Sequence, residues 1–239
     1  MTIENAKLSI PIESLIADIN CLNHIGSLGE QPESGYLRAS WSNEESSAMR
    51  FIAEVGVEHG MQVSYDKVGN LFVRTPGSQQ RFVQVGSHLD TVPRGGAYDG
   101  AVGVIAGLEA IISLKPYWET LPKVLQLVVW RGEESATFSA FCIGSKAAFG
   151  LNDPGILNNE FKGISLRKAI QNQGFDPAFI QDQQPSLPTS YIDSLSAHFE
   201  LHIEQAAVLE KEAKDIGIVN GLRGFRRMRI LVYGQAVHS

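Results

Sequence analysis

The chain has 239 residues, of which 44% are hydrophobic and 19% are charged, and this composition is ordinary for a soluble globular protein. Its 26 acidic and 20 basic residues give a net charge of −6 without any long block of like charge, which argues against a nucleic-acid or anionic-membrane surface. No apolar stretch reaches the roughly 18 residues of a membrane span. The N-terminus lacks the features of a signal peptide. Cys21 and Cys142 lie far apart, so we expect reduced thiols in a cytoplasmic protein.

The first third of the chain predicts two helices and a hairpin. Apolar residues at helical spacing predict a helix over 12–28. A second helix is predicted over 42–60, and it opens with a capping box in which Ser42 precedes Glu45 by three residues. Two short β-type runs flank "DKVGN" within 61–77 and predict a hairpin.

The middle of the chain alternates apolar strands with a helix. Buried strands are predicted at "RFVQVGSHLD" (81–90) and "KVLQLVVWRGEE" (123–134). Between them, "GAVGVIAGLEAIISL" (100–114) predicts a helix whose glycines allow close packing against a sheet. This alternation indicates an α/β domain with a largely parallel sheet.

The last third of the chain begins with a polar segment and continues with a predicted strand. Residues 152–196 hold four of the ten prolines, with one helix predicted inside "ISLRKAIQNQGF". "SAHFELHIEQAAVLEKE" then predicts a strand over 197–203 followed by a helix. Residues 215–239 predict a hairpin that opens a new β-rich module.

Candidate metal ligands follow three of the predicted strands. One strand ends at His88, the next at Glu133 and Glu134, and the last at His202, while Asp99 comes just before the predicted helix. In open parallel sheets, ligands bind at the carboxyl ends of the strands. Nitrogen and carboxylate ligands of this kind suit zinc, manganese or cobalt.

Each of these residues also has an ordinary structural role open to it. His88 could be a hydrogen-bonded structural histidine, Asp99 a helix N-cap, and the two glutamates could be stabilised by a helix dipole. His202 could lie on the polar face of an edge strand. A dinucleotide-binding loop in "GAYDGAVGVIAG" is a further alternative, but its glycines do not have the G-x-G-x-x-G spacing. The placements taken together favour the metal site.

Several motifs resemble, in order along the chain, those of the M20 metallopeptidase-like amidohydrolases: "GSHLDTVPRGGAYDGAVGV", "RGEES", "CIGS", "LHIEQ" and "GQAVHS". The most similar branch is that of the hydantoinase/carbamoylase amidases, which contains N-carbamoyl-L-amino-acid hydrolases, allantoate amidohydrolases and ureidopropionases. The resemblance runs from about residue 12 to the last residue. The chain departs from the family pattern at Thr137, where an arginine is frequent, and at Ala206 and Ala207, which replace residues that shape a turn.

The resemblance implies a hydrolase that cleaves the C–N amide bond of an N-carbamoyl amino acid or a ureido acid such as allantoate. Two divalent metal ions per full-length subunit would activate the water, either Zn²⁺ or Mn²⁺, with Co²⁺ or Ni²⁺ as alternatives. By the same resemblance His88, Asp99 and His202 are ligands of the first metal, with Asp99 bridging both ions. Glu134 is a ligand of the second metal.

The resemblance also implies roles for five further residues. Glu133 corresponds to the general base, and Asp90 to the carboxylate that orients the first histidine ligand. Gln205 and Arg226 correspond to substrate contacts, with Arg226 placed to bind the substrate carboxylate. His238 corresponds to a lid histidine that reaches across a homodimer to polarise the scissile carbonyl group.

For the fold, the resemblance implies a three-layer α/β/α catalytic domain with a mostly parallel sheet, followed by the first strands of an inserted α+β lid and dimerisation domain. We assign residues 1–214 to the catalytic domain, without its C-terminal return, and residues 215–239 to the start of the lid. The missing part would supply one more histidine to the second metal. We therefore expect the isolated chain to bind about one metal ion tightly and to lack useful amidase activity.

Two alternatives to this function stay open. One is an M20 aminopeptidase or deacylase, which would act on peptide-like bonds with the same metal centre. The other is a truncated remnant that binds a metal or a partner without turnover. For the amidohydrolase, the expected partner is a small N-carbamoyl or ureido acid, and neither a nucleic acid nor a membrane is expected.

Overall fold

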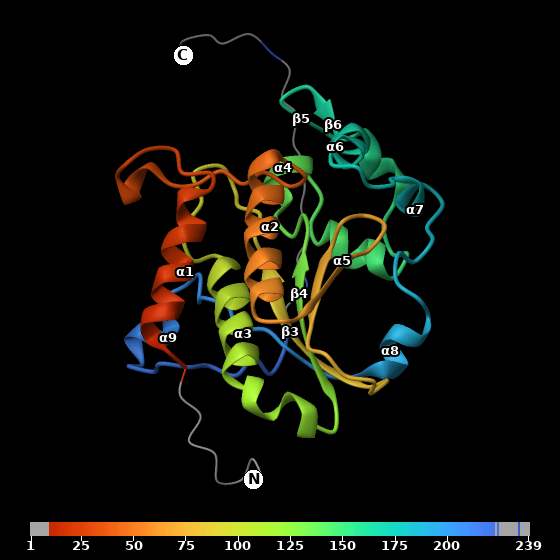
Figure 1. Cartoon of the computed structure of the whole chain (residues 1–239). Helices are drawn as coiled ribbons and strands as arrows, with labels where there is room; N and C mark the ends of the chain where they lie inside the picture. Colours follow the sequence, from red (N-terminus) through yellow and green to blue (C-terminus); the bar gives the residue numbers. More distant parts are fainter. Residues whose placement is uncertain (1–9, 223, 225–233, 235–239) are drawn as a thin grey trace. The chain divides into compact units, whose positions relative to one another are not determined.

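The computed structural model describes residues 10–222 together with Gly224 and Gly234 (Figure 1). The chain divides into two compact units, residues 1–203 and residues 204–239. All described strands belong to the first unit, and the second contains the short helix α9 (Val208–Lys211). The domain boundary expected between residues 214 and 215 remains a prediction.

A five-stranded sheet forms the centre of the first unit. Its order is β1-β2-β4-β3-β7. Strand β3 pairs in parallel with β4 and β7, whereas β2 pairs antiparallel with β1 and β4. The strands are β1 (Gln62–Tyr65), β2 (Leu71–Arg74), β3 (Phe82–His88), β4 (Val124–Trp130) and β7 (Leu195–Phe199). The α/β class is confirmed. The sheet is mixed: the predicted parallel pairing joins β3 to β4 and β7, whereas β2 lies antiparallel to β4 and forms a hairpin with β1.

Three helices cover one face of this sheet (Figure 1). They are α1 (Ile12–His24), α2 (Asn43–Glu58) and α3 (Ala101–Ser113). Together with alternate residues of the strands, such as Leu71 and Leu127, they enclose the main hydrophobic core. The first helix is shorter than predicted, and Ile12 is 67% exposed, so only the side of α1 that carries Ile19 and Leu22 reaches the core.

The opposite face of the sheet is covered by the segment that leads to β7. The Tyr191 ring of α8 (Ser190–Ser194) lies 5.0 Å from the ring of Phe82 and 6.0 Å from that of Phe72. A second apolar cluster contains Trp41, Val68 and side chains of the helices that lie between β4 and β7 in the sequence. The remaining elements are the helices α4 (Ser135–Phe138), α5 (Ile143–Ala148), α6 (Leu166–Asn172) and α7 (Ala178–Gln181), the 3-10 helices η2 (Pro32–Ser34), η3 (Lys115–Thr120) and η4 (Pro154–Asn158), and the hairpin β5 (Glu160–Phe161) with β6 (Ile164–Ser165).

The start of α2 confirms the predicted cap and shows an additional contact. The Ser42 side chain accepts a hydrogen bond from the backbone N–H of Glu45 at 3.1 Å. The Glu45 carboxylate accepts from the backbone N–H of Trp41 at 2.6 Å and from Arg131 Nη1 at 2.9 Å. Glu45 and Arg131 are both buried, so this ion pair ties the start of α2 to the residue that follows β4.

The last strand of the sheet ends earlier than predicted. Strand β7 stops at Phe199, and His202 lies in the segment that follows it, although the sequence placed His202 at the strand's end. Helix α3 packs directly on this segment, because a Cβ atom at Gly103 would lie only 2.1 Å from the carbonyl oxygen of Leu201. The close packing predicted for the glycines of this helix is confirmed, and at Gly103 it sets the path of the backbone just before His202.

Two general expectations can be compared with the described residues. No helix among them combines the length and the apolar character needed to cross a membrane. Both cysteines are free thiols, with Cys21 exposed and Cys142 partly buried.

The close approach at Gly103 yields a stability prediction. Alanine is the better helix former by about 1 kcal/mol, so helix propensity alone would make Gly103→Ala stabilising. The contact with the Leu201 carbonyl oxygen should reverse the sign and lower the free energy of unfolding by about 1–3 kcal/mol. Urea unfolding followed by circular dichroism measures the difference. An unchanged or higher midpoint for Gly103→Ala would contradict this packing.

Candidate metal centre

The ends of the two central parallel strands place chemistry-bearing residues at one edge of the sheet. His88 is the last residue of β3, and Glu133 and Glu134 follow β4 by three and four residues. Asp99 precedes α3. In register β3 and β4 run side by side, with His88 opposite Trp130. The candidate ligands therefore come together because two parallel strands end at the same level.

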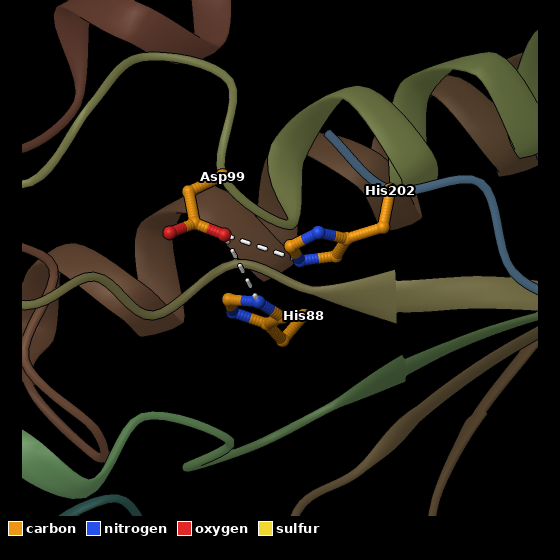
Figure 2. Close-up of side chains that lie close together, drawn as sticks. All are labelled: His88, Asp99 and His202. Carbon is orange, nitrogen blue, oxygen red and sulfur yellow. Dashed lines mark ion pairs between the residues drawn. The ribbon is translucent and has the colours of Figure 1, made fainter. Parts of the chain in front are cut away.

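Figure 2 shows the Asp99 carboxylate facing the rings of both His88 and His202. Asp99 Oδ1 lies 3.1 Å from His202 Nε2 and 3.8 Å from His88 Nε2. The two imidazole rings stack with their centroids 5.7 Å apart. Each of the three residues offers one ligand atom, and these atoms lie within 4.8 Å of one another. Ligands at about 2.1 Å around a tetrahedral zinc ion would be about 3.4 Å apart, so the spacing fits a shared ion.

A second group shares His88 with the first. His88, Glu133 and Glu134 also offer ligand atoms that lie within 4.8 Å of one another. Glu133 Oε2 is 4.0 Å from His88 Nε2. The family resemblance assigns Glu134 to a second metal and Glu133 to proton transfer. The structure brings both side chains next to His88, and their separate roles remain predictions.

Asp90 is buried beneath the two groups and contacts both. His88 Nδ1 lies 3.0 Å from the backbone carbonyl oxygen of Asp90 and 3.4 Å from its Oδ1 atom. The Asp90 carboxylate accepts hydrogen bonds from the backbone N–H groups of Glu133 at 3.1 Å and Glu134 at 3.0 Å. It therefore holds the backbone that carries the glutamates, in addition to the contact with His88 that the sequence indicated.

A glycine leaves the space that the His88 ring occupies. Gly100 has a φ of +66°, and a Cβ atom there would lie 2.6 Å from both Cδ2 and Cε1 of His88. An L side chain at this position would therefore be strained and would push the ring out of place. The donor set, its spacing and this cradle together fit a divalent metal ion.

The surroundings of the site raise the pKa values of two of its residues, His88 and Glu134. Burial by itself lowers the pKa of His88, but the side chain and carbonyl of Asp90 and the charge of Glu133 outweigh it and raise that pKa to about 9. Burial raises the pKa of Glu134 to about 7, against the opposing effect of His88 and with the repulsion of Glu133 adding to it. Without a metal ion, protons therefore compensate part of the negative charge of this site.

Three residues that the resemblance linked to substrate are not tested by these contacts. Gln205 is exposed in the second unit, and Arg226 and His238 lie outside the described residues. Two other residues contact the site without having been given a role from the sequence. Ser40 Oγ donates to Asp90 Oδ2 at 2.9 Å, and Cys142 Sγ donates to Glu133 Oε1 at 3.4 Å. The "CIGS" motif marked Cys142, whereas nothing in the sequence around Ser40 indicated a contact 50 residues away.

Known proteins share this sequence and fold over most of the chain. The family model of peptidase family M28 matches residues 70–216, which is more than half of the chain. The N-carbamoyl-L-amino acid amidohydrolase of Geobacillus stearothermophilus is 35% identical over 221 residues, covering 91% of this chain and 53% of the relative. The allantoate amidohydrolase of Escherichia coli K12 is 33% identical, covering 90% of this chain and 52% of the relative. The chain thus spans about half the length of these curated relatives.

Solved structures agree with the sequence comparison. A hydantoinase/carbamoylase family amidase from Burkholderia ambifaria matches with a TM-score of 0.72 and 33% identity, covering 86% of this chain and 48% of that structure. The sequence motifs had suggested the M20 group, and the family model that matches is M28. The chain therefore belongs to peptidase family M28, and its sequence and fold are similar to those of hydantoinase/carbamoylase family amidases.

Proposed function

We propose that the chain forms the metal-binding part of an amidohydrolase that cleaves the C–N amide bond of an N-carbamoyl amino acid or a ureido acid such as allantoate. The observation that carries the proposal is the convergence of His88, Asp99 and His202 next to the adjacent Glu133 and Glu134. The names of the relatives, which include an N-carbamoyl-L-amino acid amidohydrolase and an allantoate amidohydrolase, support this substrate class.

The proposed division of roles is the one that the family resemblance implies. His88, Asp99 and His202 would hold one divalent ion, and Glu134 would hold a second, with Asp99 between the two. When bound, such ions supply Lewis acidity that lowers the pKa of water and stabilises negative charge in the transition state. The identity of the ions, zinc or manganese first, stays part of the proposal.

Glu133 is the residue we propose for proton transfer. Its side chain is 41% exposed, and its Oε1 atom accepts a hydrogen bond from Cys142 while Oε2 faces His88. A carboxylate held in this way can accept a proton from the attacking water and donate it to the leaving nitrogen. We further propose that Gln205, Arg226 and His238 contact the substrate, and that the whole protein is a cytoplasmic homodimer.

The substrate class can be tested with two preparations. The chain itself is titrated with Zn²⁺ and Mn²⁺. For activity, residues 10–203 replace the matching segment of the Escherichia coli allantoate amidohydrolase, and the chimaera is assayed with N-carbamoyl amino acids, allantoate, dipeptides and N-acyl amino acids. We expect metal binding by the chain and hydrolysis of N-carbamoyl or ureido acids by the chimaera. Hydrolysis of only dipeptides or N-acyl amino acids would support the peptidase or deacylase alternative, and a folded, metal-loaded but inactive chimaera the non-catalytic one.

The adjacent glutamates give a matched pair of variants. Glu134→Gln removes a charged ligand and should reduce the metal content of the chimaera, whereas Glu133→Gln should keep the metal and lower kcat by about 10²–10⁴-fold, the usual contribution of a general base. Metal content is measured by elemental analysis and turnover by ammonia or amino-acid release. Equal loss of metal in both variants would show that the two roles are assigned wrongly.

The raised pKa values predict how metal binding depends on pH. Below a pH of about 9 the metal-free site holds a proton on His88, and below about 7 it holds a further proton on Glu134. A metal ion must displace these protons, so its affinity should rise with pH, by about tenfold per pH unit for each proton displaced. Calorimetric titration with Zn²⁺ in two buffers of different ionisation enthalpy counts the protons released. A pH-independent affinity without proton release would contradict the coupling of His88 to this site.

A further inference from the structure

A cavity on the face of the sheet opposite α1, α2 and α3 is lined by both cationic and apolar side chains. It has a volume of about 450 Å³ and is bounded by β1, β2, β4 and residues 186–191. Phe72, Arg74 and Gln126 line it, and they alternate along their strands with Leu71, Val73 and Leu127, which pack in the core under α1, α2 and α3. The cavity therefore opens on the other face of the sheet, and none of its lining residues belongs to the metal centre.

A row of polar side chains crosses this face in register. Arg74 of β2 pairs with Gln126 of β4, Gln126 with Gln84 of β3, and Gln84 with His198 of β7. Gln126 Nε2 donates to Gln84 Oε1 at 2.9 Å, and Gln84 Nε2 lies 3.1 Å from His198 Nδ1. Tyr191 completes the network by accepting from Gln126 and donating to Gln84. The buried Gln84 and Gln126 side chains are thus satisfied by each other, by Tyr191 and by His198, and the row ends at the cavity with the cationic Arg74.

The charges around the cavity favour an anion. Arg74 and Lys67 both line it, and in the part of the chain that the structure describes neither forms an ion pair. Arg74 Nη2 donates to the carbonyl oxygen of Gln79 at 3.0 Å, and the guanidinium carbon lies 5.5 Å from the centre of the Phe82 ring. Guanidinium has five N–H donors, so one carbonyl contact leaves capacity for a carboxylate.

Asp66 is the acidic residue of the cavity lining, and its carboxylate is occupied by other hydrogen-bond donors. Asp66 Oδ1 accepts hydrogen bonds from three backbone N–H groups, those of Val68, Gly69 and Asn70. Its Oδ2 atom accepts from the Asn70 side chain at 2.6 Å and from Ser186 Oγ at 2.7 Å. The carboxylate is thus bound by five donors of its own loop and of the 186–191 segment, so it is not available to pair with Arg74.

We propose that this cavity binds a small organic anion, with a carboxylate group on Arg74 and Lys67 and a flat apolar body against Phe72, Leu187 and Pro188. Its volume lies within the range of about 300–1,000 Å³ that is typical of small-molecule sites. The apolar walls distinguish the ligand from inorganic phosphate, and the guanidinium distinguishes it from a neutral aromatic compound. The site is separate from the metal centre, and the proposal does not depend on the amidohydrolase function.

The test uses three probes and calorimetric titration of the purified chain. The probes are 3-phenylpropionate, its neutral analogue 3-phenylpropan-1-ol, and inorganic phosphate. We expect one saturable site for 3-phenylpropionate, with at least tenfold weaker binding of the alcohol and of phosphate. Arg74→Gln should weaken the binding of 3-phenylpropionate at least tenfold. Arg81→Gln is the matched control, because it removes the same charge from an exposed position next to β3 and should leave the affinity within twofold.

Several outcomes would overturn the proposal. One is that 3-phenylpropionate shows no saturable binding. Another is that the alcohol or phosphate binds as tightly as 3-phenylpropionate. A third is that Arg74→Gln and Arg81→Gln change the affinity for 3-phenylpropionate equally. Circular dichroism and the thermal midpoint show whether Arg74→Gln folds. If it does not, Lys67→Gln serves as the second variant, because Lys67 is exposed and its loss should still weaken binding of the acid while leaving that of the alcohol unchanged.

Discussion

The buried Asp90 carboxylate is the interaction on which the geometry of the metal centre depends. It follows β3 by two residues and binds the backbone N–H groups of both Glu133 and Glu134, which follow β4. Ser40 Oγ donates to the same carboxylate from the loop before α2. Because successive N–H groups are held on the two oxygens of one carboxylate, the glutamate side chains start from a fixed backbone. A side chain that only oriented a histidine ring would leave this backbone free to shift.

The charge balance of the site explains why it should favour a cation. Asp99, Glu133 and Glu134 bring three carboxylates to the edge of the sheet, next to His88 and His202 and above the buried Asp90. Burial, with the repulsion of Glu133 adding to it, raises the pKa of Glu134 to about 7. Burial lowers the pKa of His88, but Asp90 and Glu133 outweigh this effect and raise it to about 9. A divalent ion would neutralise the same charges, so metal ions and protons are expected to compete for this site.

The sequence predicts those features that depend on local patterns. The cap at Ser42, the hairpin around residues 66–70 and the strand that ends at His88 all follow from residue types within a few positions of one another. It fails where the outcome depends on distant partners. The insertion of β2 next to β4, which makes the sheet mixed, is a pairing between residues more than 50 positions apart. The hydrogen bond from Ser40 to Asp90 could not be predicted for the same reason. It forms only when two loops that are distant in the sequence pack together.

His202 shows how a member of the candidate site can be predicted for a partly incorrect reason. Strand periodicity extended the last strand to residue 203, whereas pairing with β3 stops at Phe199. What places His202 near Asp99 is the close approach of α3 to the backbone at Leu201, which only a glycine at position 103 permits. The glycines in the helix and the histidine a hundred residues later are thus parts of one packing contact, although each was interpreted separately from the sequence.

The alternation of side chains along β4 allows one strand to serve two chemically different surfaces. Leu127 and Val129 point into the core under the helices, while Gln126 belongs to the polar row on the far face. Beyond its last residue the same strand leads to the glutamates of the metal centre. Asn70 joins the two regions, since its side chain donates to Asp66 at the cavity and accepts from the backbone N–H of Arg131, two residues before Glu133. Asn70 therefore links Asp66 at the cavity to the backbone segment that carries the glutamates of the candidate metal centre. A change in the packing of one surface is expected to affect the other.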